Sequence, residues 1–307
     1  MTNDCFCSKS FCSNLFAMSL RRLATNVPGD FFVDASCIDC DTCRWMAPGV
    51  FDRAAEQARV HHQPATEAEV EAARMALLAC PTGSIRTEAK HDLEGARKAF
   101  PLLVAEDVFH CGFHSQDSFG AASYLVRRPR ERGGNVLVDS PRWNRGLVAR
   151  LEELGGLRTI FLTHVDDVAE HARFAAHFGA ERVMHAADAV AGIERVIQGD
   201  EPVDLDRELR VVPTPGHTAG SACLAYRGRF LFSGDHLAWS ETRRHLYAFR
   251  SATWYDWVTQ IRSMERLARE RFEWVLPGHG QKVHLPAAEM REQIVLLAQA
   301  MKERSKP

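Results

Sequence analysis

Short apolar runs that end in glycine or a polar residue recur through the C-terminal part of the 307-residue chain. Residues 135–139 read Asn-Val-Leu-Val-Asp, and similar runs lie at 123–127, 159–162, 211–213, 230–232 and 273–276. Apolar runs of about 4–8 residues between turn signals are typical of buried strands. We predict that 123–127 and 135–139 form a strand pair, with Gly133 and Gly134 in the connection.

Amphipathic patterns with helical spacing follow several of these runs. They predict helices at 145–154, 257–270 and 287–302. Strands and helices therefore alternate across residues 94–307, which indicates an α/β domain.

Residues 27–93 carry a different pattern. Short strands are predicted at 31–33 and 58–61, and a helix at 67–78 opens with the capping box Thr66-x-x-Glu69. We expect a small α+β domain here, ahead of the larger α/β domain.

The charge balance excludes two function classes. The chain has 38 basic and 40 acidic residues, a formal net charge of -2. A strongly basic nucleic-acid binder or a polybasic membrane-surface protein carries an excess of Lys and Arg. No run approaches the ~20 consecutive apolar residues that span a bilayer. We expect a globular protein with a small-molecule substrate, no nucleic-acid partner and no membrane association.

Nine cysteines are the unusual feature of the composition, and most of them lie in the first 80 residues. An odd number at short spacings in a chain of this length favours metal or cluster ligation over a disulfide scaffold. We therefore expect the cytoplasm or another reducing compartment, with organellar targeting left open. Cys5, Cys7 and Cys12 fall in a tail, residues 1–26, without clear periodicity, and Met18 is an alternative start of translation.

The motif Cys37-x-x-Cys40-x-x-Cys43 lets three thiolates converge on one small inorganic group. Cys80, followed by proline at the end of the predicted helix, is the candidate for the fourth ligand. In the bacterial ferredoxin run a further Cys-Pro follows the third cysteine and serves a second cluster. Here Ala47 stands in place of that cysteine, so one cluster remains. A zinc site made from the same four thiols is the alternative.

These motifs resemble the single-cluster 4Fe–4S ferredoxins. The resemblance implies an α+β ferredoxin-like domain at 27–93, in which Cys37, Cys40, Cys43 and Cys80 hold a 4Fe–4S cluster. A redox partner for that cluster is then possible.

Four predicted strands end in histidine or aspartate, and glycine lies beside three of them. The strand at 159–162 leads into His164-Val-Asp-Asp-Val-Ala-Glu-His171. The other three lead into Pro-Gly-His217, Gly-Asp235 and Pro-Gly-His279. Polar side chains that follow buried strands gather at one edge of an α/β fold, and glycine lets backbones approach closely there. The pattern predicts a metal site that is assembled by the fold.

In their order and spacing these motifs resemble the metallo-β-lactamase fold, in its glyoxalase-II-like branch. The resemblance implies an αββα sandwich at 94–307, with one or two divalent metal ions, zinc or iron, at one edge of its two sheets. It implies that His164, His217 and His279 are metal ligands and that Asp235 is a bridging or shared carboxylate.

The first motif departs from the family pattern His-x-His-x-Asp-His. Asp166 replaces the second histidine, and an ungapped alignment puts the last pair on Val168 and Ala169, which cannot ligate. We prefer an insertion of two residues, which gives this pair as Glu170 and His171. The site then lacks one imidazole, for which Asp166 or the next aspartate substitutes. More oxygen ligands shift the metal preference from zinc towards iron or manganese.

A metal held by histidine and aspartate lowers the pKa of bound water to ~7. Asp235, Glu170 and Asp166 are the candidates for orienting this water and handling its proton. The leading hypothesis is therefore hydrolysis of an ester, thioester or similar bond.

Two other hypotheses remain open. Because hydrolysis needs no electrons, the cluster supports an iron-dependent oxidoreductase similar to the flavodiiron proteins or the persulfide dioxygenases. His164, His217 and Asp235 would then form a triad of two histidines and one carboxylate. The departure in the first motif supports a non-catalytic module for electron transfer or binding.

Overall fold

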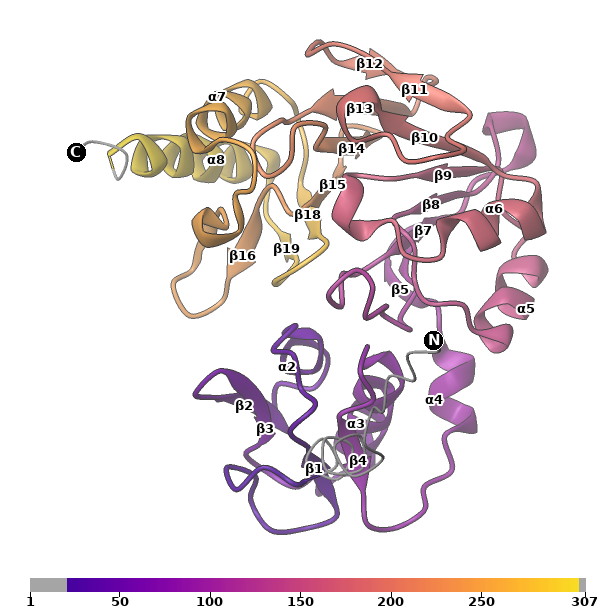
Figure 1. Cartoon of the computed structure of the whole chain (residues 1–307), viewed down its shortest axis with the longest axis vertical. Helices are drawn as coiled ribbons and strands as arrows, with labels where there is room; N and C mark the ends of the chain where they lie inside the picture. Colours follow the sequence, from indigo (N-terminus) through magenta and orange to yellow (C-terminus); the bar gives the residue numbers. More distant parts are fainter. Residues whose placement is uncertain (1–20, 304–307) are drawn as a thin grey trace, which may run out of the picture. The chain divides into compact units, whose positions relative to one another are not determined.

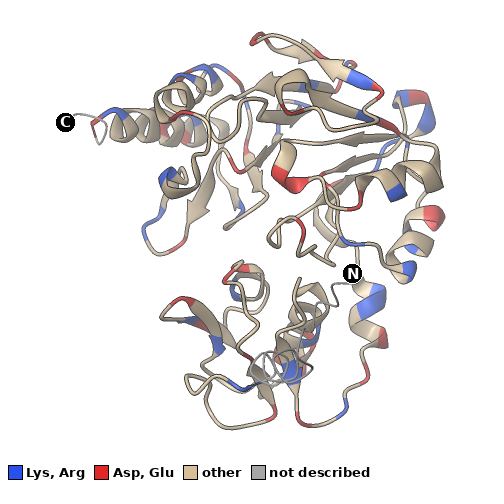
Figure 2. Cartoon of the chain, in the orientation of Figure 1, with Lys and Arg blue, Asp and Glu red and all other residues tan. Residues whose placement is uncertain are grey.

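The computed structural model describes residues 21–303, and the chain divides between Arg97 and Lys98 into two compact units (Figure 1). Cys5, Cys7, Cys12 and Met18 lie outside the described residues. Among the described helices, none is long and apolar enough to cross a membrane. Basic and acidic residues are interspersed along the elements of both units (Figure 2).

The N-terminal unit combines short antiparallel strand pairs with helices. The pairs are β1 (Phe31–Val33) with β4 (Ile85–Thr87), and β2 (Phe51–Ala54) with β3 (Gln57–Val60). Its described helices are α2 (Thr42–Met46) and α3 (Glu67–Ala79), and α4 (Glu94–Ala99) spans the boundary between the two units. The predicted capping box is confirmed, because the Thr66 hydroxyl accepts the Glu69 amide and the Glu69 carboxylate accepts the Thr66 amide.

The core of this unit joins α3 to the cysteine-bearing segments. Ala73 and Ala76 on α3 are fully buried in the same cluster as Phe31, Cys43 and Cys80. Alanine on the buried face of a helix lets neighbouring segments approach closely, because it adds only a methyl group. The helix thereby positions Cys80 at its C-terminal end, as the sequence predicted.

The C-terminal unit contains two large sheets. The first has seven strands in the order β11-β10-β9-β8-β7-β6-β5. They are β5 (Leu102–Ala105), β6 (Val108–His110), β7 (Tyr124–Val126), β8 (Val136–Val138), β9 (Thr159–Phe161), β10 (Glu181–His185) and β11 (Arg195–Ile197). The predicted pairing of 123–127 with 135–139 is confirmed as the antiparallel pair β7 and β8.

The second sheet has six strands in the order β12-β13-β14-β15-β18-β19. They are β12 (Val203–Asp204), β13 (Leu209–Pro213), β14 (Ala222–Tyr226), β15 (Phe230–Gly234), β18 (Trp274–Pro277) and β19 (Val283–His284). A separate ribbon pairs β16 (Ala238–Ser240) with β17 (His245–Tyr247). Short 3₁₀ turns lie at η1 (Arg130–Arg132), η2 (Val165–Asp167), η3 (Ala186–Asp188) and η4 (Arg250–Ala252).

Alternation along the strands fills the space between the two sheets. Val136 and Val138 of β8 belong to the same buried cluster as Leu224 and Phe232 of the second sheet. Because successive side chains of a strand point to opposite faces, Leu137 points to the outer face of the first sheet.

Helices cover the two outer faces. α5 (Arg145–Glu153) and α6 (His171–Phe178) connect the parallel strands β8, β9 and β10, and crossovers between adjacent parallel strands of one direction lie on one face of a sheet. α7 (Trp257–Leu267) and α8 (Ala287–Glu303) pack on the second sheet, where Ile261 and Ile294 share a core with Leu231. This arrangement confirms the predicted αββα sandwich (Figure 1).

Candidate functional site: a thiol-lined cavity and a histidine–carboxylate cluster

Four cysteines line one cavity of the N-terminal unit. Cys37, Cys40, Cys43 and Cys80 surround it together with apolar residues such as Ile85. Burial raises the pKa of the Cys37 thiol, raises that of Cys40 to about 11 and raises that of Cys43 well above its usual value. The other thiolates of the group act in the same direction, so four negative sulfurs in this cavity need a positive group between them. The donor set fits an iron–sulfur cluster or a zinc ion, as the sequence predicted.

Two left-handed residues shape the cysteine loop. Asp39 has φ 59° and Asp41 has φ 71°, and aspartate is among the few residues that tolerate this region. Arg44 holds both of them, with Nη1 2.6 Å from Asp39 and Nε 2.5 Å from Asp41. The charged pairs fix the turns that aim the three thiols of the motif into one cavity.

Hydroxyl groups lie against two of the cysteine sulfurs. Thr42 Oγ1 is 3.4 Å from the Cys40 sulfur, and Thr82 Oγ1 is 3.7 Å from the Cys80 sulfur. Thr82 continues into a hydroxyl chain through Ser84 at 2.6 Å. Hydrogen bonds to cluster sulfurs adjust the reduction potential of a cluster.

The second site gathers side chains from the ends of strands in both sheets of the C-terminal unit. His164 follows β9 of the first sheet, whereas His217, Asp235 and His279 follow β13, β15 and β18 of the second sheet. β15 and β18 are parallel neighbours with Gly234 opposite Pro277, so the residues after them emerge side by side. The cluster therefore lies where strand ends of both sheets meet.

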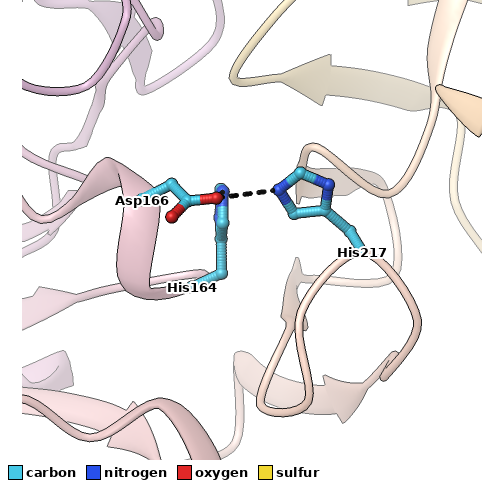
Figure 3. Close-up of side chains that lie close together, drawn as sticks. All are labelled: His164, Asp166 and His217. Carbon is cyan, nitrogen blue, oxygen red and sulfur yellow. Dashed lines mark ion pairs between the residues drawn. The ribbon is translucent and has the colours of Figure 1, made fainter. Parts of the chain in front are cut away.

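The ligand atoms of this cluster lie within a few ångströms of one another. His217 Nε2 is 3.3 Å from Asp166 Oδ2 and 3.8 Å from Asp235 Oδ2. His164 Nε2 is 3.9 Å from each of the same two oxygens. Figure 3 shows Asp166 and His164 facing His217, and the two imidazole rings are nearly perpendicular, at 83°. His279 Nδ1 lies 2.8 Å from Asp235 Oδ1.

Several of these atoms are buried without a hydrogen-bond partner. They are His164 Nε2, both ring nitrogens of His217 and both carboxylate oxygens of Asp167. Buried polar groups are normally hydrogen-bonded, so unpaired atoms that converge on one point indicate a group that binds between them. Two combinations bring ligand atoms together, His164 with Asp166 and His217, and His164 with Asp167 and Asp235. Imidazole nitrogens and carboxylate oxygens fit a divalent zinc or iron ion.

The charges inside the cluster are strongly coupled. Although burial favours the neutral acid, His279, His164 and His217 hold the pKa of Asp235 below its usual range. Burial opposes the charged form of His279 as well, but Asp235 raises the pKa of His279 to about 10. Burial lowers the pKa of His164 to about 4, so this imidazole is neutral and can act as a ligand.

A hydrogen-bonded chain orients His164. Thr163 Oγ1 lies 3.0 Å from both carboxylate oxygens of Asp139 and 2.9 Å from His164 Nδ1. When the Thr163 hydroxyl donates to Asp139, its oxygen accepts from Nδ1–H of His164, which leaves Nε2 with a lone pair towards the cluster. Such partners behind a ligating histidine fix its tautomer and its orientation. Sequence reasoning noted Asp139 only as the end of a strand and assigned no role to Thr163.

Two glycines leave room for this packing. A Cβ on Gly234, which has φ +48°, would lie 2.5 Å from Thr163 Oγ1. A Cβ on Gly278 would lie 2.7 Å from Asp167 Oδ2 and 3.0 Å from Asp235 Oδ1. Any side chain at position 278 would therefore push apart the two carboxylates.

The structure does not bring Glu170 and His171 to the cluster. The Glu170 carboxylate accepts the Trp143 amide and pairs with Arg173 at 3.3 Å, and neither residue is among the converging ligand atoms. The reason is local. The 3₁₀ turn η2 ends at Asp167 and α6 starts only at His171, so no continuous helix places the side chains of Glu170 and His171 on the same face as His164. Asp166 and Asp167 stand beside His164 instead. In the sequence, the feature that indicated Asp167 as a candidate ligand was the pair of aspartates shortly after the strand-end histidine His164.

Replacing Asp167 by asparagine should stabilise the metal-free protein while weakening metal retention. Burial and the neighbouring Asp235 raise the pKa of Asp167 well above its usual value. A carboxyl group whose pKa is higher in the folded than in the unfolded state destabilises the protein as the pH rises above its unfolded-state pKa of about 3.9. The charge of Asp167 therefore lowers the stability of the metal-free protein at pH 7. We expect a gain of about 1–3 kcal/mol in urea unfolding of chelated protein at pH 7, which shrinks towards pH 4.

The matched control for Asp167 is Asp204→Asn, because the Asp204 side chain is 65% exposed and pairs with Arg210 on the surface. This variant should change neither the unfolding free energy of the chelated protein nor the metal content. An Asp167 variant that behaved like this control would show that the buried carboxylate does not serve the metal.

Comparisons with known proteins agree with this architecture. Residues 117–279, more than half of the chain, match the family model described as the metallo-beta-lactamase superfamily. Residues 33–87 match the model described as the 4Fe-4S single cluster domain of ferredoxin I.

Similar curated proteins include hydroxyacylglutathione hydrolases. The one from Rhizobium etli is 34% identical over 137 residues, 43% of this chain and 51% of that protein. The one from Rhodospirillum rubrum is 31% identical over 148 residues, 46% of this chain and 57% of that protein. The chain thus spans about half the length of the curated relatives that it matches. Among solved structures, ETHE1 from Myxococcus xanthus aligns with a TM-score of 0.46 and 18% identity, over 65% of this chain and 92% of that chain.

Proposed function

The chain belongs to the metallo-beta-lactamase superfamily, and we propose that its C-terminal unit is a metal-dependent hydrolase that cleaves thioester bonds. The observation that carries this proposal is the convergence of orphaned nitrogens of His164 and His217 with the carboxylates of Asp166, Asp167 and Asp235. The thioester specificity is supported by the curated relatives, which are named for the hydrolysis of hydroxyacylglutathione, a thioester.

His164, His217 and Asp235, with Asp166 or Asp167, would hold the metal. A divalent ion bound there would lower the pKa of water to ~7 and polarise the thioester carbonyl. Where Asp167 holds the metal, Asp166 is free to accept the proton of the attacking water, because its side chain is 48% exposed and His217, 3.3 Å away, lowers its pKa and so keeps it ionised. The thiolate leaves as the water oxygen bonds to the carbonyl carbon.

The buried chain behind the cluster keeps these groups in place during turnover. Asp139 and Thr163 hold His164 in the tautomer whose Nε2 carries the lone pair that faces the cluster. Asp235 is held in turn by its pairing with His279. Preorganised groups of this kind stabilise developing charge without further rearrangement.

The N-terminal unit would hold one 4Fe–4S cluster on its four cysteines. The support is the cavity that these thiols line and the match of residues 33–87 to a single-cluster ferredoxin domain. Electron exchange with a redox partner is the activity that such a cluster supplies.

The proposed hydrolysis is tested on anaerobically purified protein with a hydroxyacylglutathione as substrate. Thiol release is followed before chelation, after the metal of the C-terminal unit has been removed by a chelator, and after zinc or iron has been added back. We expect turnover to disappear on chelation and to return with one of the metals, while the visible absorbance of the cluster persists. Turnover that survives metal removal, or that no metal restores, would contradict the proposal.

The trio His164, Asp166 and His217 supports a second candidate function, iron-dependent redox chemistry. Two histidines and one carboxylate with open positions are the ligand set of non-haem iron oxygenases. Metal analysis separates the two candidates. Zinc at the second site supports hydrolysis, whereas iron beyond that of one cluster supports redox chemistry.

A further inference from the structure

Exposed aromatic side chains lie beside the histidines of the metal cluster. Phe119 is 59% exposed, Trp254 67% and Tyr255 59%, and we call these three residues the aromatic rim. The Trp254 ring centre is 6.3 Å from that of His217, and the Phe119 ring centre is 6.3 Å from that of His279. Because both histidines also contact Asp235, the rim has a ring next to each of two histidines that share one carboxylate.

The backbone, and not the side chains, holds one part of the rim in place. The amides of Trp254 and Tyr255 both donate to the His217 carbonyl, at 2.8 and 3.0 Å. The next residue, Asp256, donates its amide to Gly216 at 3.0 Å and caps α7 by accepting the Thr259 amide. The fold of this segment therefore does not depend on the indole ring, which is left facing outwards.

Phe119 has a backbone conformation that is unfavourable for a residue with a bulky side chain. Its φ is +48°, in the left-handed region that bulky residues rarely adopt. Its carbonyl accepts from His279 Nε2 at 3.3 Å, and the Ala122 amide nearby donates to Gly278 at 2.7 Å. Glycine would take this φ without strain, so an exposed ring here does not serve stability. Strained residues of this kind cluster at ligand-contacting positions.

We propose that the aromatic rim binds the acyl group of the substrate, so that the site prefers thioesters of aromatic or bulky apolar acids over those of small acids such as acetate. This inference rests on the proposed thioesterase function. A thioester whose carbonyl is held by a metal bound at His217 and Asp235 would bring its acyl group next to the rings of Phe119 and Trp254, which lie beside His279 and His217. Aromatic pairing and the removal of apolar surface from water favour a flat apolar group there, whereas an acetyl group offers little apolar surface to either ring.

The test compares S-phenylacetyl and S-acetyl thioesters of the same thiol, glutathione. We expect kcat/KM of the native protein to be at least about tenfold higher for the phenylacetyl compound. Phe119→Gly and Trp254→Ala should each reduce this preference severalfold, through a larger loss of kcat/KM for the phenylacetyl than for the acetyl compound, while metal content stays unchanged. Phe119→Gly should also fold at least as stably as the native protein, because glycine relieves the strained φ.

Leu296→Ala is the matched control, because Leu296 is an exposed apolar residue of α8, 51% exposed, and has no place in the rim. It should leave the preference unchanged. Equal losses for both thioesters in the rim variants, or a native protein that prefers the acetyl compound, would overturn the proposal.

Failure of the proposed function can be told apart from failure of this inference. If the native protein hydrolyses no thioester, calorimetric titrations with phenylacetate and acetate test the rim directly. Tighter binding of phenylacetate that is lost in Trp254→Ala supports the rim as an apolar binding site. Equal binding of the two acids overturns it.

Discussion

Replacement of Asp235 by asparagine should remove the metal of the C-terminal unit and lower thioester turnover by at least ~1000-fold. Asp235 is the carboxylate that three histidines share, at 2.8 Å from His279, 3.8 Å from His217 and 3.9 Å from His164. Asparagine keeps the shape but loses the charge and one ligating oxygen. His279 also loses the partner that raises its pKa to about 10. Metal content and the rate of thiol release are the measurements.

The control for Asp235 is the same chemical change on the surface, Asp204→Asn, which removes an exposed carboxylate of β12. It should keep both metal and activity. Full turnover in the Asp235 variant with its metal retained would show that the reacting centre lies elsewhere.

Replacement of Cys43 by alanine should abolish the iron–sulfur cluster, with loss of its iron, sulfide and visible absorbance. Cys43 is almost fully buried and lines the same cavity as Cys37, Cys40 and Cys80. With three thiolates left, the cluster has one unprotected corner, and the cavity loses a ligand that no nearby residue replaces. Because the two units have separate cores, we expect the second metal and the thioester turnover to remain.

Cys223→Ala supplies the matched control, since Cys223 is also a buried free thiol and lies in β14 of the C-terminal unit. It should retain the full cluster. Zinc in place of iron and sulfide in the native protein would instead identify the four-cysteine site as a zinc site.

The sequence predicted much of the fold because the deciding signals are local. The capping box at Thr66 needs only the next three residues, and it is present at the start of α3. The apolar runs at 135–139 and 159–162 became β8 and β9, since a short β-branched segment between turns has few other ways to bury its side chains. Strands with a weaker pattern, such as β2 and the β16–β17 ribbon, were not predicted, because these short segments mix polar and charged residues with apolar ones, although each pairs with an adjacent strand along the chain.

The prediction of the site was correct for residues marked by a local motif and failed for residues placed by an assumed insertion. The structure brings together His164, His217, Asp235 and His279, which stand at strand ends beside turn residues. It leaves out Glu170 and His171, which an assumed insertion had recruited. The difference arises in three residues of chain, because a 3₁₀ turn at Val165–Asp167 points the carboxylates of this turn towards His164 and ends before Glu170.

The amino-acid sequence by itself determined which chemical groups the protein carries and that they come in two sets, thiols in the N-terminal part and imidazoles with carboxylates in the C-terminal part. Spacing along the chain suffices for that, since both sets sit in short motifs. Only the tertiary structure decided which carboxylates face His164, how Asp139 and Thr163 orient that imidazole, and where Phe119 and Trp254 stand. Some of these contacts are set by a local turn, as between His164 and Asp166, and others by packing between residues that are far apart in the chain, as between His164 and Asp235.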